Sequence, residues 1–295
     1  MKQRLLSQTG RSVTWLSIII LIPFCVLSLL PVWILVISSV ASTESLANYG
    51  FQLIPSGFSW EAYKKIFVQP DFILRSYGIS ITVTAAGTLI GVLVSSLFAY
   101  VISRPNFKAA RRLGFFIFFT LLFNGGTMSS YLLISNFLHW KNSLLALIIP
   151  ILISPFNVLL LRSYFRTIPS SLIESARIDG AGEFRTFIRI VLPLSMPAIL
   201  TVGLFMMLMY WNDMTQALLY IDQQYLYPLQ YQLYKLTFNQ SIIPQSGEQY
   251  TGTIASPLAL RMAMATLALI PIFFSFAAVQ KHFVRGIMLG GIKGD

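Results

Sequence analysis

The sequence contains little charge and almost no cysteine. Only 11% of its 295 residues are charged, whereas a soluble globular domain has about 25%. The single cysteine, Cys25, excludes an internal disulfide and a cysteine-based zinc site. The two histidines, His139 and His282, are far apart with no third ligand type nearby, so we expect no metal site. The charges cluster between long apolar runs, which argues against a separate soluble domain.

Motifs for catalysis are also missing. No G-x-x-x-x-G-K-[ST] pattern occurs, so the chain is not expected to bind ATP through a P-loop. No Ser/His/Asp, metal-ligand or paired-carboxylate cluster supports an enzyme embedded in the membrane. No internal repeat is visible, which counts against a secondary transporter, because such folds are typically built from repeats. We therefore expect neither enzymatic activity nor a cofactor bound by this chain.

Long apolar runs recur along the whole sequence, which is 56% hydrophobic. A membrane span needs roughly 20 mostly apolar residues, and backbone groups in lipid must bond within their own segment, so helices are expected. The first run is much longer than the apolar core of a signal peptide, which indicates an uncleaved helix. The sequence predicts an all-α integral membrane protein, a single domain over 1–295, with six spans at 13–40, 77–102, 113–138, 143–161, 196–221 and 257–280.

The net charge of +11 is confined largely to one set of loops. Lys and Arg are in excess in the N-terminal tail, in 103–112, in 162–195 and in the C-terminal tail. The loops 41–76 and 222–256 are near neutral. Because cytoplasmic loops retain Lys and Arg, both termini are predicted to be cytoplasmic, which agrees with an even number of spans.

The basic loop 162–195 has signals for two short helices. Ser171 and Glu174 form a capping-box pattern, and Gly180 suits the left-handed position after a helix, so a first helix is expected between them. A second helix is expected from Glu183 to Leu192, ending before Pro193.

The second helix is amphipathic, with Arg185 and Arg189 opposite its apolar face, which is formed by Phe184, Phe187, Ile188 and Val191. Such an element suits insertion into a groove of a partner protein. It would equally suit adsorption to anionic headgroups. The physical pattern leaves both interpretations open.

A spaced motif in this loop resembles that of the permease subunits of ATP-binding-cassette importers. That motif is EAA, three residues, G, nine residues and I-x-LP. Here it is Glu174-Ser175-Ala176, Gly180 and Ile190-Val191-Leu192-Pro193, with every spacing matched. Ser175 replaces the first alanine, one small residue for another.

The C-terminal tail 280–294 is glycine-rich and is similar to the tail of maltose-type sugar permeases. Further local similarities are Trp211-Asn212-Asp213, Ile178-Asp179-Gly180-Ala181 and Asn124-Gly125-Gly126. Together they resemble the branch that handles complex oligosaccharides and polysaccharide fragments, including alginate or pectin pieces. A permease for a non-sugar solute and a secondary transporter are the alternatives.

The resemblance implies a type I importer permease in a bacterial cytoplasmic (inner) membrane. It implies a heterodimer with a second permease chain, two ATPase subunits that bind ATP and Mg, and an external sugar-binding protein that delivers an oligosaccharide. It also implies which residues couple the ATPase to the spans: Glu174, Ser175, Ala176, Asp179, Gly180, Ala181, Ile190, Leu192, Pro193, Gly290, Gly291, Lys293 and Gly294.

Polar residues inside the spans are candidates for the sugar path. Asn124 and Gly125 lie about 16 Å into the third span at 1.5 Å per residue, where a broken helix would mark a binding site. A kink that allows close helix packing is the alternative. Asn157 follows Pro155 and either restores hydrogen bonding at a proline kink or contacts sugar.

Asp213 and Arg261 are predicted at matching depths near the outer face. They form either a structural ion pair or, with Tyr210, Trp211 and Asn212, the outer mouth of the path, where aromatic rings would stack on sugar.

Overall fold

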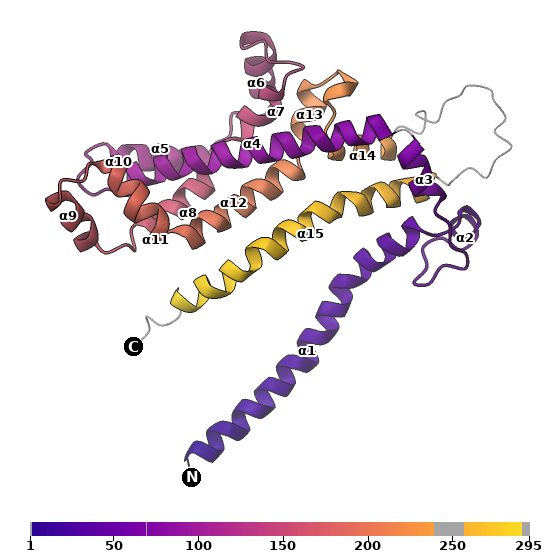
Figure 1. Ribbon diagram of the computed structural model, residues 1–295, viewed down its shortest axis with the longest axis horizontal. Coiled ribbons are helices and arrows are strands. Elements are labelled where there is room, and N and C mark those ends of the chain that lie inside the picture. Colours follow the sequence, from indigo (N-terminus) through magenta and orange to yellow (C-terminus); the bar gives the residue numbers. More distant parts are fainter. Residues whose placement is uncertain (1, 69, 239–256, 291–295) are drawn as a thin grey trace. The chain divides into compact units, whose positions relative to one another are not determined.

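The computed structural model describes residues 2–68, 70–238 and 257–290 (Figure 1). Within these ranges the chain is helical and forms no strand beyond one isolated bridge between Ala41 and Phe58. The longer helices are α1 (Lys2–Ser39), α4 (Pro70–Ser103), α5 (Ala110–Leu122), α8 (Pro155–Phe165), α12 (Met196–Trp211), α14 (Leu229–Phe238) and α15 (Pro257–Gly290). The shorter helices are α2 (Thr43–Tyr49), α3 (Glu61–Val68), α6 (Thr127–Tyr131), α7 (Leu144–Ile148), α9 (Ser170–Ile178), α10 (Glu183–Thr186), α11 (Leu192–Leu194) and α13 (Thr215–Tyr220).

Three described helices are long and apolar enough to cross a membrane: 15–39 within α1, 73–103 within α4 and 258–277 within α15. Three further candidates are bent pairs of helices, at 110–137, 144–165 and 183–211, with angles of 111°, 49° and 83°. Six spans result if each bent pair contributes one span, in agreement with the sequence; in the third pair the predicted span begins with α12, and 183–194 belongs to the loop 162–195.

Three of the predicted spans are not continuous helices in the structure. The spans 113–138 and 143–161 are each interrupted, and the span 196–221 ends as a helix at Trp211. Apolar composition predicts that a segment lies in the membrane. It does not predict where Gly, Pro or Asn interrupts the helix within an apolar run.

The chain divides into two units, one formed by 1–70 and 236–269 and the other by 71–235 and 270–295. In the first, α1 exposes apolar side chains along its whole span. Its carboxyl end is tied to the following segment, since Trp33 Nε1 donates to the Leu53 carbonyl at 3.0 Å and Ser39 Oγ lies 2.8 Å from the Tyr63 hydroxyl.

The second unit has a core formed by α4, α5, α8, α12 and the loop helices between α8 and α12. The buried residues include Ala99, Val158, Phe187, Val191 and Val202. Two glycines on α4 let α12 approach closely, because a Cβ at Gly87 would lie 2.3 Å from the Tyr210 ring and one at Gly91 would lie 2.1 Å from Met206 Cε. The same core therefore holds both the spans and the loop that carries the motif.

Candidate functional site

The first loop helix, α9, begins two residues earlier than predicted. Its N-cap is Pro169, and no side chain caps it. The predicted capping box of Ser171 and Glu174 is therefore wrong, because both residues lie inside the helix. Pro169 occupies the N-cap position with φ −55° and ψ 130°, and its side chain has no oxygen to accept a hydrogen bond, so α9 begins without a side-chain cap. Glu174 is left exposed on the helix surface.

The end of α9 agrees with the prediction. Gly180 has φ +76°, the left-handed conformation that favours glycine. The Gly180 N–H donates to the Arg177 carbonyl at 3.0 Å, and the Ala181 N–H donates to the Ala176 carbonyl at 2.8 Å. These two bonds are those of a Schellman motif, which satisfies the last carbonyls of the helix and reverses the chain. Ser175 and Asp179 are exposed beside this turn.

The second loop helix continues past its predicted end. From α10 the chain passes through a π-helical turn, η3 (Phe187–Val191), into α11, which ends at Leu194. The prediction that it stops before Pro193 is wrong. A π-turn widens the helix, and we infer that the extra room accommodates the proline ring that would otherwise clash with the preceding turn.

The π-turn also changes which apolar residues face the core. Phe187 and Val191 are buried, whereas Phe184 and Ile188 are exposed, so the predicted single face is only half correct. Ile190 and Leu192 of the motif are half-buried, and Pro193 is exposed.

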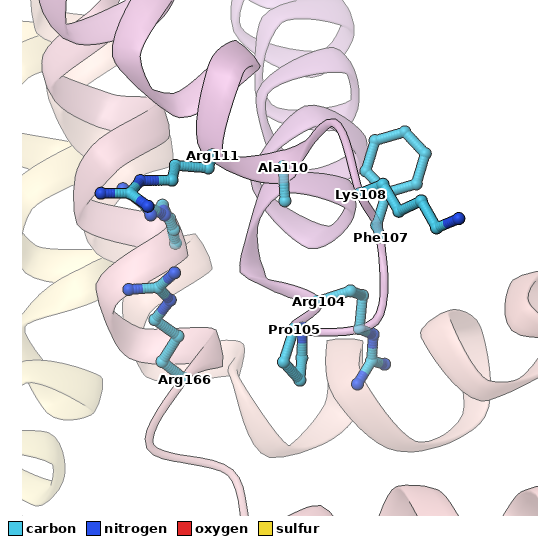
Figure 2. Close-up of a pocket in the computed structure, with 8 residues that line it drawn as sticks. Arg104, Pro105, Phe107, Lys108, Ala110, Arg111 and Arg166 are labelled. Carbon is cyan, nitrogen blue, oxygen red and sulfur yellow. The ribbon is translucent and has the colours of Figure 1, made fainter.

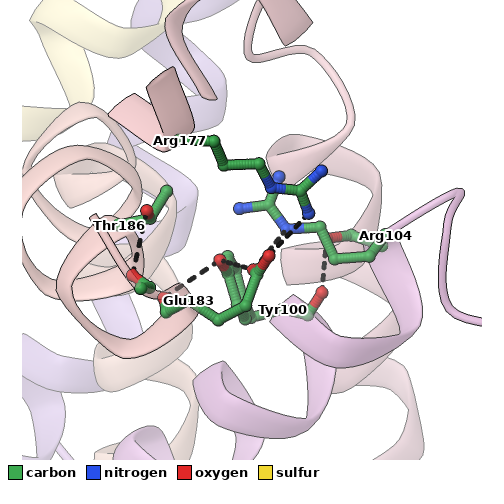
Figure 3. A network of polar contacts seen from close by, with 7 residues as sticks. Tyr100, Arg104, Arg177, Glu183 and Thr186 are labelled. Atoms are coloured by element: carbon green, nitrogen blue, oxygen red, sulfur yellow. Dashed lines mark hydrogen bonds and ion pairs between the residues drawn. The ribbon is translucent and has the colours of Figure 1, made fainter. Parts of the chain in front are cut away.

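A polar network joins the start of α10 to the last turn of α4 (Figure 3). The Tyr100 hydroxyl donates to Glu183 Oε2 at 2.7 Å, and its ring packs on Phe187 with centroids 5.0 Å apart. Arg177 Nη2 donates to Glu183 Oε1 at 2.5 Å. Arg104 lies over the Tyr100 ring, 4.1 Å from its centroid, and its Nε is 3.9 Å from Glu183 Oε2. Glu183 therefore links both loop helices to α4.

The electrostatics of this network favour an ionised Glu183. The Tyr100 hydrogen bond, the Arg177 hydrogen bond and the two nearby guanidinium groups lower the pKa of the Glu183 carboxyl, against the opposing effect of burial. The same contact raises the pKa of the Arg177 guanidinium. Neither the charge pattern nor the spaced motif pointed to Tyr100, Arg104 or Glu183 as site residues. The pair Tyr100 and Arg104, one turn apart at the end of an apolar run, was the available signal.

The surface of the turn between α9 and α10 combines apolar and charged side chains. Ile178 is 87% exposed and Phe184 is 69% exposed, one on each side of Gly180. Arg185 and Arg189 are exposed on the second helix. Large apolar side chains exposed on a protruding turn mark a contact surface for a partner.

The third predicted span is broken where the sequence indicated. Between α5 and α6 the chain is non-helical, Gly126 has φ +84°, and its N–H donates to Asn124 Oδ1 at 2.9 Å. Asn124 and Gly125 are exposed, and a Cβ at Gly125 or Gly126 would meet no described atom within 4 Å. The break therefore does not serve close helix packing within the described part of this chain.

Tyr210 and Trp211 lie in the interior, which contradicts the predicted aromatic mouth in this conformation. They are 4% and 3% exposed. The Tyr210 hydroxyl donates to the Ile148 carbonyl at 2.8 Å, and its ring fills the space left by Gly87. A carbonyl at the end of α7 is thereby satisfied by a side chain, and stacking on sugar would require these rings to leave the core.

The remaining path candidates are placed differently. Asn212 is exposed, and Asp213 Oδ2 accepts from the Gln216 N–H at 3.2 Å, so Asp213 helps to start α13. Asn157 is buried in α8, but Pro155 is the first residue of that helix and loses no helical hydrogen bond, so the predicted repair of a proline kink is wrong. Arg261 lies in the other unit, and its pairing with Asp213 stays a prediction.

The tail is described only in part. Gly290 is the last residue of α15, and Gly291, Lys293 and Gly294 lie outside the described residues. In the described part of the chain no group of three His, Cys, Asp or Glu side chains could hold a metal ion.

Comparison with known proteins places this geometry in a family. Residues 91–289 match the family described as binding-protein-dependent transport system inner membrane components. The chain is 38% identical to the polygalacturonan/rhamnogalacturonan transport system permease protein YtcP of Bacillus subtilis, over 93% of this chain and 96% of that protein. It is 28% identical to the trehalose/maltose transport system permease protein MalG of Thermococcus litoralis, over 95% of this chain and 94% of that protein.

A solved structure has the same fold. The chain superposes with a TM-score of 0.83 and 25% identity on a chain from the crystal structure of a bacterial ABC transporter involved in the import of the acidic polysaccharide alginate, covering 93% of this chain and 98% of that one. The fold is thus that of a type I importer permease. With the family match over 91–289, this shows that the chain is a multi-pass membrane protein that belongs to the binding-protein-dependent transport system inner membrane component family.

Proposed function

We propose that this chain is one of two transmembrane subunits of an ATP-driven importer that takes up oligosaccharides. The relatives that support the substrate class are a polygalacturonan/rhamnogalacturonan permease and a trehalose/maltose permease. In this proposal both termini and the loop between α8 and α12 are cytoplasmic. A second permease chain completes the path, and two ATPase subunits bind ATP and Mg. An external binding protein delivers the sugar.

The observation that carries the proposal is the construction of the loop. Ile178 and Phe184 expose apolar surface beside the Gly180 turn, and Glu183 ties the same turn to Tyr100 on α4. A partner subunit that moves this turn would therefore also move the end of a membrane span, as a rigid-body transition requires. The coupling residues are those of the motif and the turn: Glu174, Ser175, Ala176, Asp179, Gly180, Ala181, Ile190, Leu192 and Pro193.

The sugar path in this proposal includes the break at Asn124 and Gly125, which faces open space in the described structure. Asn212, Asp213 and Arg261 remain candidates near the outer end. Tyr210 and Trp211 act mainly as packing residues.

The test is reconstitution of the full complex with its ATPase subunits, second permease and binding protein. ATP hydrolysis is measured with the binding protein loaded from a panel of neutral and acidic oligosaccharides. Stimulation by one class of sugar, accompanied by its uptake, is expected. Stimulation by a peptide or an inorganic anion and by no sugar would contradict the substrate class, and uptake without ATP would contradict the mechanism.

A further inference from the structure

An open pocket of about 410 Å³ lies among the loop after α4, the start of α5 and the end of α8 (Figure 2). Its lining contains five basic side chains and no acidic one: the residues are Arg104, Pro105, Phe107, Lys108, Ala110, Arg111, Arg162 and Arg166. The function proposed above makes no use of this pocket.

Three arginines form one side of the pocket. Arg111 extends from α5 and Arg166 from α8 toward the same space, whereas Lys108 points away (Figure 2). Arg162 is held in place, since its Nε donates to the Ile102 carbonyl at 3.3 Å and its guanidinium lies where a Cβ on Gly114 would touch it at 3.4 Å. The guanidinium thus lies next to α5 at ordinary van der Waals distance from a side chain at this position.

The charge of these three arginines is not balanced within the described residues. The ion pairs there join Arg104 to Glu183, Lys141 to Asp222 and Arg177 to Glu183. None includes Arg111, Arg162 or Arg166. Guanidinium groups gathered around one space repel one another unless an anion lies between them, and their forked geometry fits the oxygens of a phosphate.

A row of aromatic side chains continues from the pocket along α5. Phe115 and Phe119 follow Arg111 at four-residue intervals on α5, each about 40° further round the helix, and Phe123 is the residue that follows its last turn. Their rings are in contact, with centroids 6.4 Å apart in the first pair and 4.4 Å apart in the second. All three are exposed. A polar anion site thus meets an exposed apolar strip that runs into the span.

We propose that this pocket binds the phosphate of an anionic membrane phospholipid, with an acyl chain along Phe115, Phe119 and Phe123. A free phosphate would use the arginines but not the aromatic row. The acidic surface of a partner protein would not need an apolar strip that starts at the membrane boundary. The inference rests on the proposed cytoplasmic position of this loop, where anionic lipids attract basic clusters.

The experiment is native mass spectrometry of the full importer complex with added phosphatidylglycerol, phosphatidylcholine or inorganic phosphate. Phosphatidylglycerol is expected to stay bound to this chain when phosphatidylcholine does not. The double variant Arg111→Gln/Arg166→Gln should lower phosphatidylglycerol affinity roughly tenfold to thirtyfold, from the loss of two charge contacts. Arg162 is left unchanged because it also packs against α5.

Two matched controls keep the result specific. Arg112→Gln removes a neighbouring charge that does not line the pocket and should leave binding unchanged. Arg111→Lys/Arg166→Lys keeps the charge but loses the forked contact, so its affinity should lie between those of the wild type and the double glutamine variant. Phe119→Ala should weaken lipid binding without altering charge, which gives a readout even if the double glutamine variant does not assemble.

Three results would overturn the proposal. The first is an equal loss in Arg112→Gln, which would mean general charge attraction. The second is displacement of phosphatidylglycerol by excess inorganic phosphate with no effect of Phe119→Ala, which would mean a free-anion site. The third is loss of the ATPase subunits from the double glutamine variant with lipid binding intact, which would mean a protein contact. Lipid binding is read independently of transport, so the two proposals can fail separately.

Discussion

Gly180 adopts a backbone conformation that other residues reach only with strain. At φ +76° a Cβ costs about 1–2 kcal/mol, although open space surrounds the residue. Gly180→Ala should therefore destabilise the turn between α9 and α10, and Gly180→Leu should also place bulk on the partner surface. We expect reconstituted complexes with either variant to hydrolyse more ATP per sugar transported than the wild-type complex does.

The matched control for this turn is Gly182→Ala. Gly182 is also exposed with no atom near its Cβ, but its φ is −70°, which any residue adopts. The Gly182→Ala complex should hydrolyse as much ATP per sugar transported as the wild-type complex does. Normal transport by Gly180→Leu would show that the turn has no mechanical role.

Glu183 is the residue at which the loop's stability depends on pH. Its pKa is lowered in the folded state, so its contacts with Tyr100 and Arg177 stabilise the protein above the unfolded pKa of about 4.3. This contribution is lost as pH falls through the folded pKa. The side chain is 54% exposed, so screening limits the effect to about 0.5 kcal/mol.

Glu183→Gln should accordingly lower the unfolding temperature of the purified complex slightly at pH 7, and the difference from wild type should shrink as the pH falls below about 4.3 and through the lower folded pKa. Glu174→Gln on the same loop is the control, since Glu174 is exposed and no hydrogen bond is assigned to its carboxylate in the described residues. A difference that grows toward low pH would contradict this role of Glu183.

At the scale of elements, Tyr210 connects α12 to the end of α7. Its buried hydroxyl donates to the Ile148 carbonyl at 2.8 Å, where α7 passes into the 3-10 helix η2 (Ile149–Ile151). Tyr210→Phe removes this buried hydrogen bond, so it should destabilise the protein by about 0.5–1.5 kcal/mol. Thermal unfolding of the purified complex measures the loss.

Tyr225→Phe is the control, because that hydroxyl is exposed and bonds only to Gln223 in the described structure. If the Tyr210→Phe complex had normal stability but weaker sugar uptake, Tyr210 would act in the sugar path and not mainly in packing.

Sequence reasoning succeeded where the cause was local. Gly180 ends α9, and the Asn124–Gly126 segment breaks a span, because glycine and asparagine act through their own backbones. It failed where two local signals compete and where a distant element decides the outcome. Pro169 starts α9 ahead of the capping pattern, and a π-turn carries the next helix past Pro193. The burial of Tyr210 depends on Gly87, more than one hundred residues earlier. The spacing of apolar residues in α12 does not predict the contact between Tyr210 and Gly87.

For the whole molecule, the proposed function requires that the loop surface bind the ATPase subunits. Ile178 and Phe184 provide the largest exposed apolar area beside the Gly180 turn. Their burial in a partner groove should supply about 1.5–3 kcal/mol for each side chain. Ile178→Ala/Phe184→Ala should therefore reduce the amount of ATPase subunit that co-purifies with the permease pair, without lowering the yield of the pair itself.

Leu218→Ala on α13 is the matched control. Leu218 is also apolar and exposed, but it follows α12 in the sequence and precedes the loop 222–256, which is external in the proposed topology. It should retain the ATPase subunits fully. Because the double variant leaves Glu183, Tyr100 and the helix turn intact, a loss of the ATPase subunits would come from the missing apolar contact and not from a disordered loop. Full retention of the ATPase subunits by Ile178→Ala/Phe184→Ala would mean that this turn is not their docking surface, and the coupling route from Gly180 through Glu183 to α4 would then have no input.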